Sequence, residues 1–132
     1  MIKMKTVQEK KKIENYFETH DPKYLSEDTV FINMSNSELT IGRKAVGKML
    51  HYIYHVAFDA HAEITNTIVT DDKAVLEANF VGKHIGEFAG IKPTGKNVKV
   101  PLCVTYDLEE SGLVKVARVY MLESVMMQQL TN

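Results

Sequence analysis

The second half of the chain constrains the fold most, because from about residue 60 onward it is patterned almost continuously as strand. Turn-forming residues divide it into four strand-like segments: 60–70, 74–86, 97–108 and 113–123. In the third segment every even position from Val98 to Leu108 is apolar or aromatic, which is the period-two pattern of a strand with one buried face. Strands that follow one another through short turns predict an antiparallel sheet.

The first half of the chain carries helical patterns instead. Three helices are predicted there, over residues 3–20, 23–25 and 42–58, with short strands at 29–34 and 39–41. The first helix ends at Asp21-Pro22, a pair suited to capping and starting the short helix that follows. A last helical turn or two is predicted over 124–130. Helices first and strands afterwards is the order of an α+β domain. We therefore predict a curved, mostly antiparallel sheet wrapped around three N-terminal helices, a cystatin-like cone.

Length and composition predict one globular domain over residues 1–132 and exclude some partners. A chain of 132 residues can bury a core without disulfides or metals, and 45% hydrophobic with 25% charged residues is ordinary. A formal net charge of -1 predicts neither nucleic-acid binding nor attraction to an anionic membrane. The single cysteine, Cys103, has no internal partner, and no signal segment or long apolar run is visible. We therefore expect a cytoplasmic protein.

One glycine-punctuated loop is the most specific motif. Residues 82–96 read Gly-Lys-His-Ile-Gly-Glu-Phe-Ala-Gly-Ile-Lys-Pro-Thr-Gly-Lys, so a strand passes one histidine to a loop that ends in a Pro-Thr-Gly turn. This segment resembles the Gly-Thr-His-x-Gly-Glu-Phe-x-Gly-x-Pro-Pro-Thr-Gly-Lys signature of the SnoaL-like polyketide cyclases, a branch of the nuclear transport factor 2-like folds. The Met-Met-Gln-Gln-Leu ending at 126–130 is also similar to that family's usual Leu-Leu-x-Gln-Leu.

The resemblance implies a ligand pocket inside the cone and a cofactor-free enzyme that closes a polyketide ring by aldol condensation. In that reaction a carboxylate removes a proton from a carbon between carbonyls, and nearby donors hold the enolate. Counted without gaps from Gly112, the family's tryptophan position falls on Arg118 and its aspartate position on Leu122. The neighbouring Glu123 is an acid, but the period of two directs it to the opposite face unless a bulge intervenes. Leucine cannot accept a proton. Two hypotheses therefore stand: acid–base catalysis on a carbonyl or ester substrate, and non-catalytic binding of a small apolar or acidic ligand.

Three residues are predicted to act if the chain is an enzyme of the cyclase or isomerase type. His84 matches the family histidine and is the predicted proton acceptor or enolate donor, Arg118 the electrostatic clamp, and Tyr120 the hydroxyl donor. Each of the first two has an alternative. His84 could be held by a backbone carbonyl, and Arg118 could pair with Glu77 or Asp107.

The cone interior is predicted from aromatic bulk and inward parity. The side chains expected to bind the ligand are Tyr16, Ile53, Phe58, Phe80, Phe88, Tyr106 and Leu122. We expect no metal and no cofactor. His51 and His55 stand four apart on a helix, but no third ligand shares their face.

The strand over 113–123 is apolar on both faces, so a second cover is needed on the outside of the sheet. We predict a homodimer through the sheet, with Val119 and Met121 near its twofold axis.

His20 is interpreted as a cap at the C-terminus of the first helix, and Glu87 as a residue that orders the glycine loop.

Overall fold

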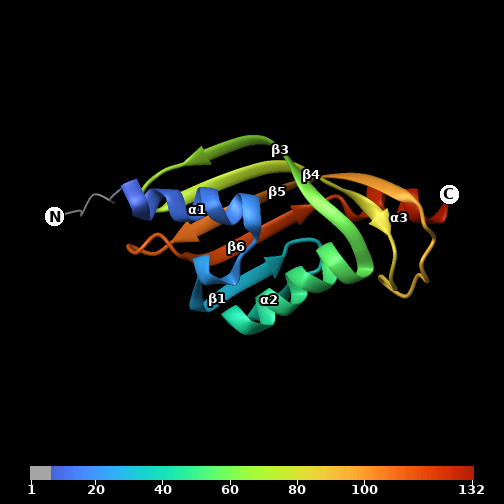
Figure 1. The fold of residues 1–132 in the computed structure, drawn as a ribbon, viewed down its shortest axis with the longest axis horizontal. Helices are drawn as coiled ribbons and strands as arrows, with labels where there is room; N and C mark the ends of the chain where they lie inside the picture. Colours follow the sequence, from blue (N-terminus) through green and yellow to red (C-terminus); the bar gives the residue numbers. More distant parts are fainter. Residues whose placement is uncertain (1–6) are drawn as a thin grey trace.

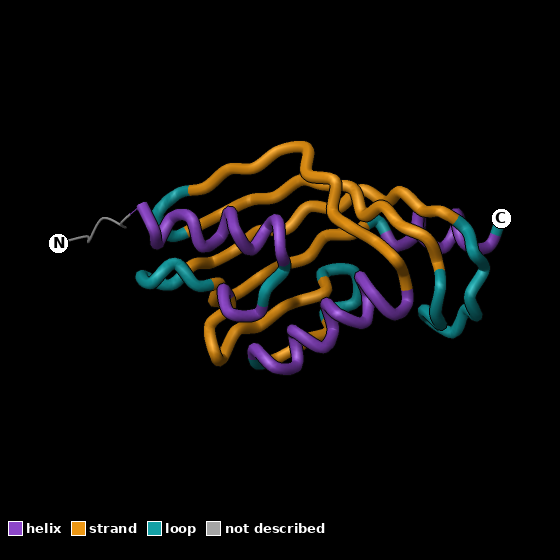
Figure 2. Tube along the Cα trace, in the orientation of Figure 1, coloured by secondary structure: helices purple, strands orange, loops and turns teal. Residues whose placement is uncertain are grey.

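The computed structural model describes residues 7–132 and shows one curled sheet with helices against it (Figures 1 and 2). The elements, in chain order, are α1 (Val7–Thr19), a 3-10 turn (Pro22–Tyr24), β1 (Leu25–Asn33), β2 (Glu38–Ile41), α2 (Arg43–His51), a π-helical turn (Tyr52–Ala57), β3 (Phe58–Val69), β4 (Lys73–His84), β5 (Asn97–Leu108), β6 (Val114–Met121) and α3 (Glu123–Thr131). The predicted α+β class is confirmed. The first four residues of the predicted helix over 3–20 lie outside the described residues.

The sheet has six strands in the order β2-β1-β6-β5-β4-β3. Every neighbouring pair is antiparallel except β1 and β6, which run parallel, so the sheet is mixed but mostly antiparallel as predicted. Strands β3 to β6 form the predicted meander, joined through turns and the glycine loop. The first and last strands of the chain lie side by side in the middle of the sheet, since β1 pairs directly with β6.

Helix α1 lies on the inner face of the sheet because its apolar stripe has the helical spacing. Ile13, Tyr16 and Phe17 are buried in the same cluster as Leu76 of β4 and Tyr106 of β5. A second buried cluster joins α3 to the far ends of β4 and β5 (Figure 1). The inner face is therefore covered at one end by α1 and at the other by α3.

The segment between α1 and β1 follows the predicted capping chemistry. The Asp21 carboxylate accepts a hydrogen bond of 2.9 Å from the backbone N–H of Lys23, and Pro22 opens the 3-10 turn. The turn is shorter than an α-helix, and β1 begins at Leu25, four residues before the predicted start of that strand.

The helix predicted over 42–58 is one continuous segment with two geometries. Residues 43–51 are α-helical, and residues 52–57 form a wider π-helical turn that leads straight into β3. Such turns are rare and often occur at functional sites. This turn carries Tyr54 and His55 to the opening of the cone.

The parity predicted for β6 is wrong. Ala117, Val119 and Met121 pair with Tyr106, Val104 and Leu102 of β5, so they share the inner face of the sheet. Val119 and Met121 pack against the two buried clusters, so they are not available to a partner on the outer face. The residues between them in sequence, Arg118 and Tyr120, project outward instead.

Candidate functional site

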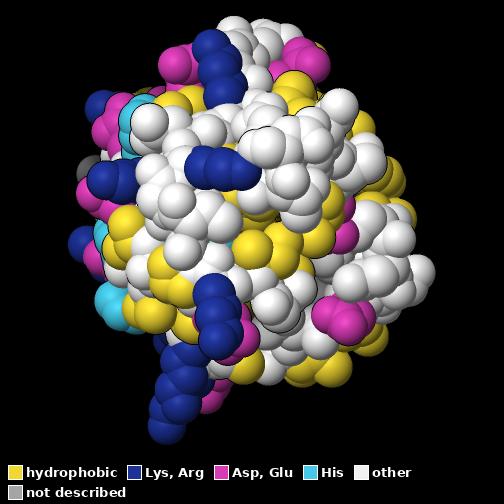
Figure 3. Space-filling model, turned by 90° about the vertical axis from the view of Figure 1, so that its right-hand side faces the viewer, with side chains coloured by type: hydrophobic (Ala, Val, Ile, Leu, Met, Phe, Trp, Pro, Cys, Tyr) yellow, Lys and Arg dark blue, Asp and Glu magenta, His cyan; other side chains and the backbone are white. Residues whose placement is uncertain are grey.

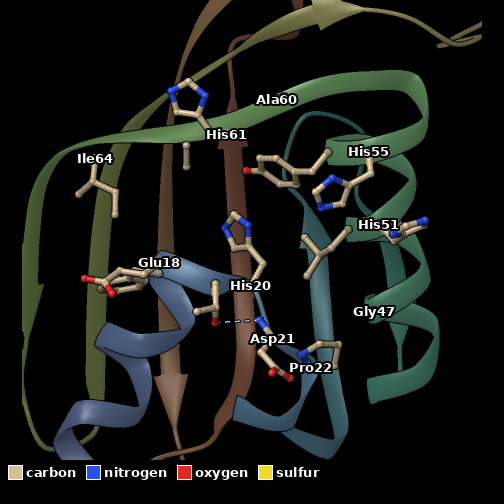
Figure 4. Close-up of a pocket in the computed structure, with 15 residues that line it drawn as sticks. Glu18, His20, Asp21, Pro22, Gly47, His51, His55, Ala60, His61 and Ile64 are labelled. Carbon is tan, nitrogen blue, oxygen red and sulfur yellow. Dashed lines mark hydrogen bonds between the residues drawn. The ribbon is translucent and has the colours of Figure 1, made fainter.

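A cleft opens between α1, the segment formed by α2 and the π-helical turn, and β3 (Figure 4). Its volume is about 760 Å³, within the range typical of small-molecule sites. The end of α1 supplies Phe17 and His20, the α2 segment supplies Leu50 and Tyr54, and β3 supplies small side chains such as Ala62. Neither the glycine loop of residues 82–96 nor any of the seven side chains predicted to bind the ligand lines this cleft.

His20 stands at the centre of this cleft because of the way α1 ends. Its φ of 52° is left-handed, a conformation that costs a non-glycine residue roughly 1–2 kcal/mol. Its backbone N–H donates to the Tyr16 carbonyl at 2.8 Å, which closes the helix. The backbone of His20 therefore makes the predicted cap, whereas its ring extends into the cleft (Figure 4).

The His20 ring is held between two tyrosines. Its centroid lies 4.5 Å from that of Tyr54 at an interplanar angle of 35°, and 5.4 Å from that of Tyr16 in an edge-on contact. Burial, with a smaller contribution from the charge of His55, lowers the pKa of His20 to about 4. The ring is therefore neutral at pH 7.

Three tyrosine hydroxyls gather below the cleft. Burial raises the pKa of Tyr54 to about 12. It also raises the pKa values of Tyr16 and Tyr106, to which the negative charges of neighbouring tyrosines add. No hydrogen bond among residues 7–132 engages these three hydroxyls or the His20 ring. The three tyrosines are thus neutral hydrogen-bond donors at physiological pH.

The rim of the cleft is polar, with Glu18 and Asp21 on one side and His51 and His55 on the other. None of the described residues that line the cleft is a lysine or an arginine. His55 extends toward the cleft, whereas His61 points to the outer side of β3, consistent with its pairing with Val81 (Figure 4). Within the described chain, no group of three or more His, Cys, Asp or Glu residues is placed to hold a metal ion.

His84 is fully buried at the other end of the aromatic core, away from the cleft. The backbone N–H of Thr94 donates to its Nδ1 at 3.2 Å, and Oγ1 of the same residue lies 3.0 Å from that nitrogen. Because Nδ1 accepts this hydrogen bond, the ring N–H is the one at Nε2, which has no hydrogen-bond partner. Phe58 packs on the ring with centroids 5.1 Å apart. Thr94, and not a backbone carbonyl, thus orients this histidine.

The loop of residues 85–96 closes over His84. The backbone N–H of His84 donates to the Lys96 carbonyl, and the N–H of Gly86 donates to the Ala57 carbonyl, each at 2.9 Å. The Tyr52 hydroxyl donates to the Glu87 carbonyl, so the backbone of Glu87 ties the loop to the π-helical turn. In the space-filling view of this end of the molecule, apolar side chains (yellow) are exposed between charged ones, and Lys or Arg lies next to Asp or Glu at several places (Figure 3).

Arg118 and Tyr120 lie on the outer face of the sheet, so the structure does not bring them to His84. Arg118 makes two hydrogen bonds of 3.1 Å to the Asp107 carboxylate, which also accepts from Lys73 at 2.6 Å. These two cations lower the pKa of Asp107. Asp107 is one of the two alternative partners predicted for Arg118 from the sequence. The predicted role of Arg118 as a clamp on the ligand required it to face the cone interior, and its outward position contradicts that role.

Six of the seven side chains predicted to bind the ligand face the interior, namely Tyr16, Ile53, Phe58, Phe80, Phe88 and Tyr106. Leu122 does not, because it is 52% exposed at the start of α3. The adjacent Glu123 accepts a hydrogen bond of 3.0 Å from the Asn33 side chain at the same place. The carboxylate next to the family's aspartate position is thus engaged in holding β1 to α3.

Sequence reasoning missed His20 and Tyr54 as lining residues of the cleft. A signal was present for His20, since it completes the apolar stripe of α1 at the seventh position after Ile13. For Tyr54 there was none, because the π-helical turn that changes its direction has no sequence signature.

Comparison with known proteins shows the family of this chain. The sequence matches the SnoaL-like polyketide cyclase family over residues 11–130. The chain belongs to the SnoaL-like polyketide cyclase family. No curated protein matches its sequence.

Solved structures agree on the fold. A protein from Jannaschia sp. CCS1 assigned as a SnoaL-like polyketide cyclase superimposes with a TM-score of 0.84 at 18% identity, covering 99% of this chain and 96% of that one. One from Pseudomonas putida KT2440 assigned as a polyketide cyclase gives 0.78 at 15% identity, covering 93% and 98%. AclR from Streptomyces galilaeus, assigned as a hydroxylase, gives a TM-score of 0.67 at 23% identity, covering 82% of this chain and 78% of that one.

Across residues 7–132 the helices are too short or too polar to span a lipid bilayer.

Proposed function

We propose that this protein binds a small carbonyl or ester compound in the cleft and performs acid–base chemistry on it without a cofactor. The observation that carries the proposal is the cleft itself, in which His20 and Tyr54 lie over an apolar and aromatic interior. An apolar wall with a few convergent polar groups is the usual composition of a small-molecule site. Family membership supports the same substrate class.

Calorimetry with a neutral probe, methyl 2-naphthoate, tests the binding part. Leu50 lines the cleft, so Leu50→Trp is expected to fill it and weaken binding at least tenfold. Leu39 is 57% exposed on β2, away from the cleft, so Leu39→Trp is the matched control and is expected to bind as the wild type does. Equal affinity in both variants would refute binding in this cleft.

Non-catalytic binding is the second candidate, and the position of Leu122 favours it. That residue stands at the family's aspartate position and is exposed outside the cone. Under this alternative the side chains that line the cleft enclose the ligand, and no proton is transferred to or from it. Binding without any proton exchange on the ligand would favour this reading.

A homodimer through the outer face of the sheet is part of the proposal. Tyr120 is 46% exposed on β6, and half-buried Val116 stands on the same face of that strand. A second copy placed there would cover both residues. Light scattering at micromolar concentration is expected to report a dimer for the wild type and a monomer for Tyr120→Glu. A monomeric wild type would contradict the proposed dimer.

A cytoplasmic location remains a prediction from the single cysteine.

A further inference from the structure

We propose that His20 and Tyr54 form the acid–base pair of the cleft, in which a His20 ring nitrogen takes the proton and the Tyr54 hydroxyl holds the enolate oxygen. This inference rests on the proposed function, because it requires that a carbonyl compound occupy the cleft. It assigns the chemistry to residues on α1 and on the π-helical turn, and not to the histidine of the glycine loop.

The geometry of the two rings supports the pair. They come from different elements, both line the cleft, and their centroids are 4.5 Å apart. In Figure 4 the His20 ring reaches from the end of α1 into the space under β3. A flat carbonyl compound lying across the two rings would contact both polar ends.

Both groups are free to engage a ligand. Among residues 7–132 neither the His20 ring nor the Tyr54 hydroxyl has a hydrogen-bond partner. His84 differs, because Thr94 occupies its Nδ1 and the glycine loop encloses it. Of these two histidines, His20 is therefore the one placed to exchange protons with a ligand in the cleft.

The charges around His20 suit a neutral base. The titratable groups around it are Tyr16 and Tyr54, whose rings contact it, and, among the other residues of the cleft, Glu18, Asp21, His51 and His55. With its pKa near 4, the His20 imidazole has the proton affinity of an ordinary carboxylate but carries no charge before the reaction. It can therefore serve as the base that Leu122 cannot supply.

The backbone holds His20 in this position. Its left-handed φ of 52° is one that glycine or asparagine adopts more readily. The hydrogen bond of Asp21 N–H to Thr19 Oγ1, at 3.1 Å, fixes the turn after it. The backbone conformation at the end of the helix thus directs the His20 side chain into the cleft. The ring nitrogens take no part in holding it there.

The proposed step is a proton abstraction. The C–H bond between two carbonyls of the ligand breaks, its electron pair forms the enolate, and the proton moves to a His20 ring nitrogen. The resulting imidazolium and enolate attract each other in the buried cleft, and the Tyr54 O–H hydrogen-bonds to the enolate oxygen. The imidazolium exchanges this proton with solvent, and return of a solvent-derived proton from the ring to the same carbon restores the neutral ligand and the neutral ring.

Deuterium exchange at the α-carbon of ethyl benzoylacetate in D₂O, followed by proton NMR, measures this step directly. The wild-type protein is expected to accelerate exchange over buffer. His20→Gly keeps the left-handed turn and is expected to lose at least 100-fold of that acceleration, with partial recovery on addition of free imidazole. Tyr54→Phe keeps both ring contacts and is expected to lose at least tenfold.

Two further variants make the result specific. Ser37 has a φ of 64° in an exposed turn, so Ser37→Gly is the matched control for a left-handed residue and is expected to exchange as the wild type does. Full exchange in His20→Gly, loss of exchange in His84→Ala alone, or a wild type no faster than buffer would overturn the pair. If the naphthoate still binds in any of these cases, the cleft remains a binding site and only the chemical assignment fails.

Discussion

The buried neutral state of His20 makes the stability of the protein dependent on pH in a defined window. The pKa of His20 is lowered from 6.5 to about 4 in the folded protein, so the unfolded chain binds the proton first as the pH falls. The stability that the neutral, buried imidazole of His20 contributes is therefore complete above pH 6.5 and is lost as the pH falls from that value to pH 4. At about 1.36 kcal/mol per pKa unit, the loss between pH 7 and pH 5 is about 2 kcal/mol.

Urea unfolding at pH 7 and pH 5 tests this reasoning in wild type and in His20→Asn. Asparagine tolerates the left-handed backbone and does not titrate, so the variant is expected to lose about 2 kcal/mol less than the wild type on acidification. The other four histidines are present in both proteins, so their contributions cancel in the comparison. Equal pH dependence in the two proteins would show that His20 is not buried in its neutral form.

Three further expectations concern the core, the glycine loop and the outer face. Phe80 is fully buried and contacts the Tyr54 ring, so Phe80→Ala is expected to cost about 3–5 kcal/mol in urea unfolding, and a loss below about 1 kcal/mol would contradict its placement. A Cβ on Gly86 would lie 2.2 Å from the Val56 carbonyl oxygen, so Gly86→Ala is expected to destabilise the protein by at least about 1–3 kcal/mol; thermal unfolding at wild-type temperature would count against the close approach. Asp107→Asn is expected to cost about 1 kcal/mol or less at pH 7 and to leave naphthoate binding unchanged. Because the pKa of Asp107 is lowered, that cost should vanish as the pH falls through the folded value, and a weakened ligand affinity would contradict its position outside the cone.

The strands over the middle of the sheet could be predicted from sequence because only one of their faces is apolar. In β5 the even positions are the apolar ones, and Tyr106 indeed faces inward with Phe80 of β4. In β6 both faces carry apolar side chains, so alternation alone could not say which one is buried. The pairing of β6 with its two neighbouring strands shows that the face with Ala117 is the buried one, since Ala117 lies opposite Tyr106 of β5 and Phe31 of β1.

The candidate site was less predictable than the fold because two local backbone features direct its side chains. His20 was correctly placed at the end of the first helix, but its ring direction depends on a left-handed φ that histidine adopts infrequently. The direction of Tyr54 depends on the π-helical turn, which the apolar spacing over 42–58 does not distinguish from an α-helix.

The parallel pairing of β1 with β6 governs when the protein can fold during its synthesis. The sheet cannot be completed until residues 114–121 have left the ribosome, because β6 lies between β1 and the β5-β4-β3 meander. Until then the hydrogen-bonding edges of both β1 and β5 are open. The face of the sheet against which the apolar residues of α1 pack is also incomplete. Contacts between residues about 85 apart in the chain slow folding, because a long loop must close before they form. Loss of the last 20 residues would therefore leave two incomplete sheets, each with an exposed edge, and aggregation would be the expected fate of such a fragment.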